Sequence, residues 1–296
     1  MSQVQQTEPT LEVLAPLESG VEAVQGRTPW QLFYTRFKRD RIALFAAGVV
    51  LLLIALALLA PAFARFVVHR GPNDLNQGYT SDISVPLLGP SKIAWFGVDA
   101  LGRDIFIRTL YGARTSLLIA ILATGISIVV GIALGLMAGF VGGKLDTFIS
   151  RLIDIVLSLP LLLLAIGIGA ARIVRGQTLS LREREFVEAA RATGYGNIHI
   201  MFREILPNMV ASIIVVATLL IPQNILFEAA LSFLAVGVPA GTPSWGGMLS
   251  DATNGALYRI AWWMLFFPGM FLVMTTLAFN LLGDGLRDAL DPRAGR

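Results

Sequence analysis

The residue types that carry most enzyme chemistry are scarce in this chain. It has no cysteine and only two histidines, His69 and His199, which lie far apart in the sequence. A thiol nucleophile, a disulfide framework and a thiolate metal site are therefore excluded, and two isolated imidazoles do not make a zinc or haem site. We expect no catalytic residue, no metal ion and no cofactor bound by this chain.

The sequence also lacks a phosphate-binding loop. Such a loop needs a glycine, four residues and then Gly-Lys-Ser/Thr, so that backbone amides hold the phosphates and the hydroxyl holds magnesium. The nearest segment is Gly142-Gly143-Lys144-Leu145, which has Ala138 at the first glycine position and Leu145 in place of the hydroxyl. Any ATP hydrolysis linked to this protein must therefore take place on another subunit.

Glu228 is the one acidic residue in the long apolar run 205–250. A carboxylate inside a membrane is costly, so such a residue faces a substrate path or a polar partner on a neighbouring helix. We expect Glu228 in the outer third of its span, hydrogen-bonded to another span. It is a candidate for the translocation path or for gating.

The sequence around these residues is that of a membrane protein. Hydrophobic residues make up 55% of the 296 residues and charged residues 15%, against roughly 45–50% and about 25% in soluble domains. Several runs of more than twenty residues contain no charge, as expected of helices that cross a bilayer. The net charge of +3 fits basic loops beside lipid headgroups, because no Lys/Arg run is dense enough to bind nucleic acid. The expected fold class is an all-α polytopic membrane protein.

Charge patterning divides the chain into five parts. Residues 1–26 contain four Glu and no Lys or Arg, and a basic cluster then precedes the first apolar run, which places the N-terminus in the cytoplasm. The parts are a cytoplasmic N-terminal tail (1–41), a first span (42–64), an extracytoplasmic loop (65–112), a transmembrane core (113–283) with a polar loop at 176–208, and a cytoplasmic C-terminal tail (284–296). The second span is predicted from Thr115 to about Val141.

The predicted topology conflicts with itself at the third apolar segment, which lies between Asp154 and Arg172. As a helix its seventeen residues reach about 26 Å, enough for one pass and too little for two. One pass would place the Arg-rich stretch 172–204 outside, against the positive-inside rule. Either residues 152–171 form a re-entrant or half-span element, or one apolar segment is missing.

Strong helix signals follow that segment. Ser180 and Glu183 have capping-box spacing, so a helix is predicted to start there and to stop at Gly194. Asn197 is predicted to cap a second short helix that ends at Leu206-Pro207. Two short amphipathic helices joined at a glycine fit two roles equally well, docking into a partner at the membrane surface or lying on lipid headgroups.

Packing expectations follow from three other groups of residues. Gly125, Gly131, Gly135 and Gly139 in the second span are predicted to let a neighbouring helix approach the backbone. Arg151 and Asp154, three residues apart, are predicted to pair. The remaining group is predicted to anchor the chain at the lipid interface, and consists of Trp245, Trp262 and Trp263.

Four motifs occur in order along the chain. Glu188-Ala189-Ala190 is followed by Gly194 after four residues and by Leu206-Pro207 after twelve more. The other three motifs are Phe96–Asp104, Glu228–Leu234 with Pro243–Gly246, and Asn280–Asp288. Together they resemble the permease subunits of ABC importers, in particular the C-type subunit of the dipeptide/oligopeptide permease group. The resemblance covers about residues 30–293, and the first motif is similar to the family's EAA loop.

The resemblance implies a type I ABC importer transmembrane fold in the bacterial plasma (inner) membrane. It implies that the loop at 176–208 holds a coupling helix that docks into an ATP-binding subunit, with Glu188 capping or bracing that helix and Gly194 permitting the turn. The coupling residues carried over are Glu188, Ala189, Ala190, Gly194, Leu206 and Pro207. The implied partners are a homologous second permease subunit, two ABC ATPases that bind ATP and magnesium, an extracytoplasmic peptide-binding receptor and the lipid bilayer.

The chain departs from that family in one place. Members normally have six spans, with a fourth span before a segment that is matched here by Ala171–Gln177. Between about Leu164 and Ala171 this chain is short by about thirty residues, from about twenty residues per pass plus a loop. The positive-inside argument finds the same defect independently. A natural deletion, an altered chain and missing residues all remain open as causes.

The function implied by the resemblance is ATP-driven import of dipeptides or oligopeptides. Nickel and glutathione, which relatives in the same group carry, are the alternative cargoes. A secondary transporter is a weaker alternative, because the sequence shows neither inverted repeats nor paired carboxylates at the midplane. A channel would need a repeated filter segment, which we do not find.

Overall fold

The computed structural model describes residues 29–75, 88–158, 162–239 and 241–290, and its regular structure is helical. In chain order the helices are α1 (Pro29–Phe37), α2 (Arg41–Ala62), η1 (Phe63–Val68), α3 (Ile105–Val141), α4 (Gly143–Ser158), α5 (Leu162–Arg182), α6 (Glu185–Ala192), α7 (Asn197–His199), η2 (Ile200–Ile205), α8 (Leu206–Phe233), α9 (Trp245–Thr253), η3 (Asn254–Arg259) and α10 (Trp263–Leu290).

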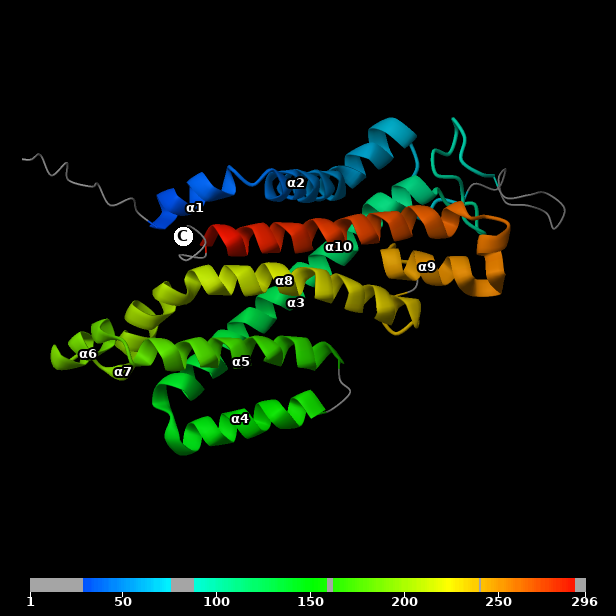
Figure 1. Cartoon of the computed structure of the whole chain (residues 1–296). Coiled ribbons are helices and arrows are strands. Elements are labelled where there is room, and N and C mark those ends of the chain that lie inside the picture. The colour runs from blue at the N-terminus through cyan, green and yellow to red at the C-terminus, as the bar shows by residue number, and fades with distance from the viewer. Residues whose placement is uncertain (1–28, 76–87, 159–161, 240, 291–296) are drawn as a thin grey trace, which may run out of the picture.

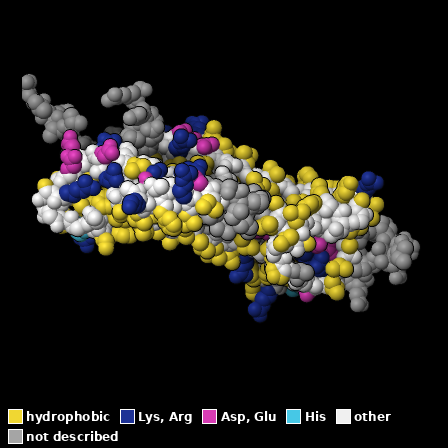
Figure 2. Space-filling model, turned by 90° about the horizontal axis from the view of Figure 1, so that it is seen from below, with side chains coloured by type: hydrophobic (Ala, Val, Ile, Leu, Met, Phe, Trp, Pro, Cys, Tyr) yellow, Lys and Arg dark blue, Asp and Glu magenta, His cyan; other side chains and the backbone are white. Residues whose placement is uncertain are grey.

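Four helical segments in the described part of the chain are long and apolar enough to cross a membrane. They are Arg41–Val68, Ile105–Val141, Asn197–Phe233 and Trp263–Leu290. These segments form an elongated bundle, with α9 and the loop that precedes α3 at one end and α6 at the other (Figure 1). We call these the α9 end and the α6 end. Figure 2 shows a broad apolar surface between them, with most of the charged side chains of that face gathered towards the α6 end.

Two aspartates set where the first two long helices begin. Asp40 Oδ1 accepts hydrogen bonds from the backbone N–H groups of Ile42 and Ala43, and Asp104 Oδ1 accepts from that of Ile107. Both are N-caps, which satisfy amides that have no partner inside the helix. Because α3 starts at Ile105, and not at Thr115, the segment between η1 and α3 is shorter than the predicted loop of residues 65–112.

The third apolar segment is not a single pass. The chain forms α4, reverses after Ser158, and returns as α5 beside α3 (Figure 1). Neither helix of this hairpin is among the four candidate spans, and the apolar start of α5, residues 162–171, reaches only about 15 Å, half of a hydrocarbon core. A half-span hairpin returns the chain to the end from which it left. The C-terminal ends of α3 and α10 then lie at the α6 end of the bundle, together with α6 itself. This removes the conflict with the positive-inside rule.

Ion pairs join the two helices of the hairpin. Arg175 on α5 makes a two-pronged contact with Asp146 on α4, with Nη2 2.7 Å from Oδ2, and this guanidinium holds the pKa of Asp146 below its usual range. Arg172 Nη2 lies 2.7 Å from Asp154 Oδ1, but both side chains are more than half exposed, so this pair contributes little. The predicted Arg151–Asp154 pair is wrong, because Asp154 bonds across the hairpin.

Close packing of α5 on α3 depends on three glycines. A β-carbon added at Gly131, Gly135 or Gly139 would lie 2.7–2.8 Å from a side-chain carbon of Ala170, Val174 or Thr178 respectively. The predicted close approach is therefore confirmed at these three positions. A β-carbon added at Gly125 would meet no atom of the described residues within 4 Å. Small residues of this kind let two helix backbones approach within a membrane.

Candidate functional site: the α6 surface and the buried acid Glu228

Helix α6 starts later than the capping box predicts. Ser180 lies inside α5, which runs on to Arg182, and α6 begins at Glu185 with Arg184 as its N-cap residue. The extension of α5 has a tertiary cause. Arg182 Nη1 lies 3.2 Å from the carbonyl oxygen of Gly139 and 3.3 Å from that of Phe140, at the last turn of α3. A cation at this position satisfies carbonyls that have no partner inside the helix.

One face of α6 is fixed to the bundle. Val187 and Ala190 are buried in an apolar cluster with residues of α3, α5, η2 and α8, among them Phe140, Val174 and Ile205. Because α6 is a short helix, which has little stability of its own, this cluster fixes its position. The guanidinium of Arg191 also stacks over the ring of Phe140, 5.4 Å from its centroid.

The opposite face of α6 is exposed. Glu188 and Ala189 lie on it, and the side chain of Glu188 makes no hydrogen bond or ion pair within the described residues. The capping or bracing role that the resemblance implied for Glu188 stays a prediction. Glu185 and Glu188 do lie in the first turn, where negative charge is favoured by the helix dipole.

Gly194 forms the predicted turn. Its φ is +85°, the N–H of Gly194 donates to the carbonyl of Arg191, and the N–H of Tyr195 donates to that of Ala190. This pair of bonds is a Schellman motif, whose left-handed residue is usually glycine. A β-carbon at Gly194 would meet nothing within 4 Å. The backbone angle, and not lack of space, therefore requires glycine here.

The chain beyond the turn does not stop at Leu206-Pro207. Asn197 is the first residue of α7 and not its cap, and the helix continues through the π-helical segment η2 into α8. Pro207 has no N–H to donate, so one backbone hydrogen bond of the continuous helix is absent where η2 passes into α8. Leu206 packs against the same apolar cluster as α6.

Exposed apolar side chains continue the free face of α6. Tyr195, Ile198 and Phe202 are each more than half exposed, and Ile198 reaches 75%. The Tyr195 ring stacks on His199 at 4.2 Å between centroids. We call Glu188, Ala189, Tyr195, Ile198 and Phe202 the α6 surface. Large apolar residues at a helix surface next to charged ones are typical of a protein interface.

Glu228 lies far from this surface. Twenty-two residues of one helix separate it from Leu206, which is about 33 Å. It is 5% exposed, its Oε2 accepts from Ser116 Oγ of α3 at 2.6 Å, and its Oε1 accepts from Ser232 Oγ at 2.8 Å. The predicted hydrogen bond to a neighbouring span is present. One turn earlier, Asn224 Nδ2 donates to Thr124 Oγ1 of α3 at 2.8 Å.

The segment after α8 packs back onto Glu228 through α9. The backbone N–H of Trp245 lies 3.4 Å from Ser116 Oγ, and its indole N–H donates to the carbonyl of Thr109. A β-carbon at Gly246 would collide with the backbone of Ala229, so this glycine permits the contact between α9 and α8. The motifs at 228–234 and 243–246 are thus one packing unit.

The prediction that the three tryptophans anchor the chain at the lipid interface is wrong for two of them. Trp245 is fully buried, and Trp263 is buried with its indole N–H bonded to the carbonyl of Val98. Trp262 is exposed, as predicted. Sequence reasoning also missed an ionic cluster at the α9 end, where Arg103 and Arg108 contact Asp99 and Asp251. The only signal for it was the density of charge in 99–108.

Comparisons with known proteins agree with this architecture. Residues 161–296 match the family described as binding-protein-dependent transport system inner membrane component, and residues 28–90 match the N-terminal TM domain of oligopeptide transport permease C. An oligopeptide transport system permease protein of Bacillus subtilis is 38% identical over 285 positions, which cover 89% of this chain and 90% of that protein. A dipeptide transport system permease protein of Alkalihalophilus pseudofirmus is 39% identical, covering 90% of each. A glutathione transport system permease protein of Escherichia coli O157:H7 is 42% identical, covering 92% and 93%.

The match to the Bacillus protein extends over 285 positions but uses 89% of the 296 residues of this chain, about 263. The relative therefore carries about 22 residues in the matched region that this chain lacks.

Proposed function

Because the chain belongs to the family of binding-protein-dependent transport inner membrane components, we propose that it is the permease subunit of an ATP-driven importer for dipeptides or oligopeptides. In this proposal ATP is hydrolysed by two partner ATPases, an extracytoplasmic receptor delivers the peptide, and a homologous second permease completes the passage. The names of the relatives from Bacillus subtilis and Alkalihalophilus pseudofirmus support the cargo class.

The coupling role is supported by the two faces of α6, one of which is buried in the bundle while the other is exposed. Its inner face is fixed to α3, α5 and α8 through Val187 and Ala190, while Ala189 and Ile198 remain exposed. A force applied to the α6 surface therefore reaches three long helices directly. This is the arrangement needed if closure of an ATPase dimer is to move the spans.

The charge distribution supports a cytoplasmic position for the α6 end. Lysine and arginine are frequent there, in the loops and helix ends that hold Arg36, Lys38, Arg39, Arg41, Lys144, Arg182, Arg184, Arg191, Arg203 and Arg287. By the positive-inside rule this end faces the cytoplasm. ATP-binding partners would meet the α6 surface on that side.

Enlarging Ala189 tests this proposal. Ala189→Trp places a bulky ring on the exposed face of α6 without entering the apolar cluster, so the subunit should fold normally. Peptide uptake and peptide-stimulated ATP hydrolysis by the complete transporter should fall by about tenfold or more, the usual scale of disruption at the centre of an interface.

Thr147→Trp is the matched control, because Thr147 is also exposed near the α6 end but belongs to α4. It should retain uptake. Equal uptake by the two variants, with normal amounts of both in the membrane, would show that the α6 surface does not couple to an ATPase.

Glutathione is a second candidate cargo. It is favoured by one observation, the 42% identity to permeases named for glutathione transport. Glutathione is itself a tripeptide, so the two cargoes make the same demand for a peptide-sized passage. Competition of unlabelled glutathione with a labelled dipeptide in the same uptake assay separates them.

A further inference from the structure

Glu228 is a buried carboxylate that forms no ion pair with any residue the structure describes. Two serine hydroxyls donate to it, but the ion pairs in the described part of the chain all involve other residues. The stretch 159–169 contains no basic residue in its sequence either. A carboxylate in an apolar environment needs hydrogen bonds and a compensating charge to remain ionised. The two hydroxyls supply the hydrogen bonds. No residue that the structure describes supplies the compensating charge.

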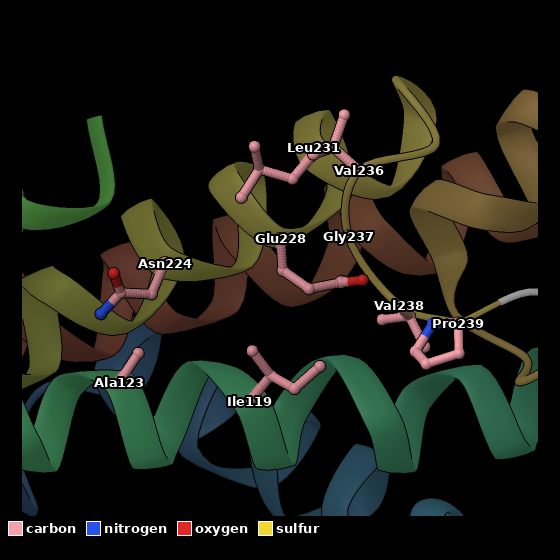
Figure 3. Close-up of a pocket in the computed structure, with 9 residues that line it drawn as sticks. All are labelled: Ile119, Ala123, Asn224, Glu228, Leu231, Val236, Gly237, Val238 and Pro239. Atoms are coloured by element: carbon pink, nitrogen blue, oxygen red, sulfur yellow. The ribbon is translucent and has the colours of Figure 1, made fainter. Parts of the chain in front are cut away.

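A cavity adjoins this carboxylate. It measures about 370 Å³ and lies between α8, α3 and the segment Val236–Pro239. Figure 3 shows the Glu228 side chain directed into this space, with Ile119 on the opposite wall. Asn224, one turn away on the same face of α8, lines it as well. The other walls are mainly apolar, and the volume falls in the range of small-molecule sites.

The register of α5 on α3 shows where the described part of α5 begins relative to this cavity. Contacts between α3 and α5 join residues 39 positions apart, as in Gly131 with Ala170 and Gly135 with Val174. In the same register, the first residue of α5, Leu162, comes level with Ala123. Ala123 and Ile119 line the cavity, so the cavity lies at and beyond the described start of α5.

The geometry points to the Glu228 cavity as a binding site for the protonated amino group of a peptide during translocation. This inference rests on the proposed function and adds a recognition element to it. The carboxylate would supply the charge, the apolar walls would accommodate side chains, and the serines would hold the carboxylate in place. The described lining offers the Glu228 carboxylate as a hydrogen-bond acceptor and contains no cationic group, so it would reject the carboxylate end of the same peptide.

Two other occupants give different results in a direct test. A lipid acyl chain would contact the apolar walls and make no interaction with the carboxylate. An inorganic cation would bind the carboxylate and leave most of the cavity unfilled. The test must therefore measure charge preference and peptide protection separately.

Because the chain has no cysteine, Ile119→Cys can report on the cavity in the complete transporter, reconstituted in nanodiscs. The rates of modification by a positively charged and a negatively charged methanethiosulfonate reagent of similar size are compared. Any effect of Glu228 on the reactivity of the thiol itself is the same for both reagents and cancels in the ratio. The positive reagent should react about tenfold faster than the negative one, as expected for one nearby charge at low dielectric.

Variants with matched changes identify the source of that ratio. Glu228→Gln keeps the shape and should bring the ratio close to that of Leu101→Cys, an exposed position in the loop before α3 and outside the cavity. Dialanine should slow modification of Ile119→Cys, N-acetyl-dialanine should not, and neither should protect once Glu228→Gln is added. Protection by sodium ions alone, equal protection by both peptides, or a ratio unchanged by Glu228→Gln would each overturn the inference.

Peptide uptake measured on the same preparations separates this inference from the proposed function. If the transporter imports dialanine while Ile119→Cys shows no charge preference, the amine site is wrong and the importer assignment stands. If no peptide is imported and none protects Ile119→Cys, both are wrong.

Discussion

Gly135→Leu is expected to separate α5 from α3 and to lower the stability of the protein more than any other single change proposed here. A β-carbon at this position would already lie 2.7 Å from Val174 and 2.9 Å from the backbone of Ala171. Overpacking of this kind costs about 1–3 kcal/mol, and a leucine adds three more carbons against backbone that cannot move aside. The thermal unfolding midpoint of the purified protein in detergent measures the effect.

Gly125→Leu is the control for this prediction. It lies in the same helix, and a β-carbon there would meet no described residue within 4 Å, so the exchange is expected to improve helix propensity by about 1 kcal/mol at most. The midpoint should stay the same or rise. Equal losses of stability for Gly135→Leu and Gly125→Leu would contradict the packing of α5 against Gly131, Gly135 and Gly139 of α3.

Gly194→Val is expected to abolish most peptide uptake while the protein still inserts in the membrane. The φ of +85° costs about 1–2 kcal/mol for a residue with a β-carbon, and more for a β-branched one. This corresponds to roughly a 5- to 30-fold loss in the population of the correctly set turn, and with it the position of the α6 surface. The measurement is the initial rate of uptake, normalised to the amount of subunit in the membrane.

Gly194→Asn tests the cause, because asparagine tolerates the left-handed conformation better than other residues. It should retain much of the uptake. If valine and asparagine at this position transport equally well, the turn geometry does not matter for coupling. If both fail equally, the loss of glycine acts through something other than the backbone angle.

The motifs predicted from sequence describe the site better than the helix limits do. The turn at Gly194 was predictable because a left-handed residue after a helix has a local signature. The start of α6 was not, because α5 continues through Ser180 for a reason outside the local sequence. Arg182 reaches the carbonyls at the end of α3, and Thr178 packs on Gly139. Tertiary contacts of this kind override a capping box.

The hairpin shows a similar limit. Counting apolar residues between Asp154 and Arg172 gives one pass, and the positive-inside rule and the six-span pattern of the resembled family both conflicted with this count. The chain resolves the conflict with two short antiparallel helices, whose ion pair between Asp146 and Arg175 could not be located without knowing that they face each other. Likewise, the burial of Trp245 depends on its bond to Thr109, 136 residues away.

The position of Glu228 was foreseen only in part. Its isolation in an apolar run predicted a polar partner on another span, and Ser116 is that partner. The cavity beside it is lined in part by residues 236–239, which return from α8. That return has no local sequence signature.

Accessibility of a single cysteine at position 192 tests the central claim most directly. Ala192 is exposed at the end of α6, and Leu101 is exposed near the α9 end, so Ala192→Cys and Leu101→Cys report on opposite sides of the membrane. With a membrane-impermeant maleimide, Leu101→Cys should be labelled in intact spheroplasts and Ala192→Cys only after they are opened. Labelling of Ala192→Cys in intact spheroplasts would place the α6 surface outside, beyond the reach of any ATPase, and would contradict the account.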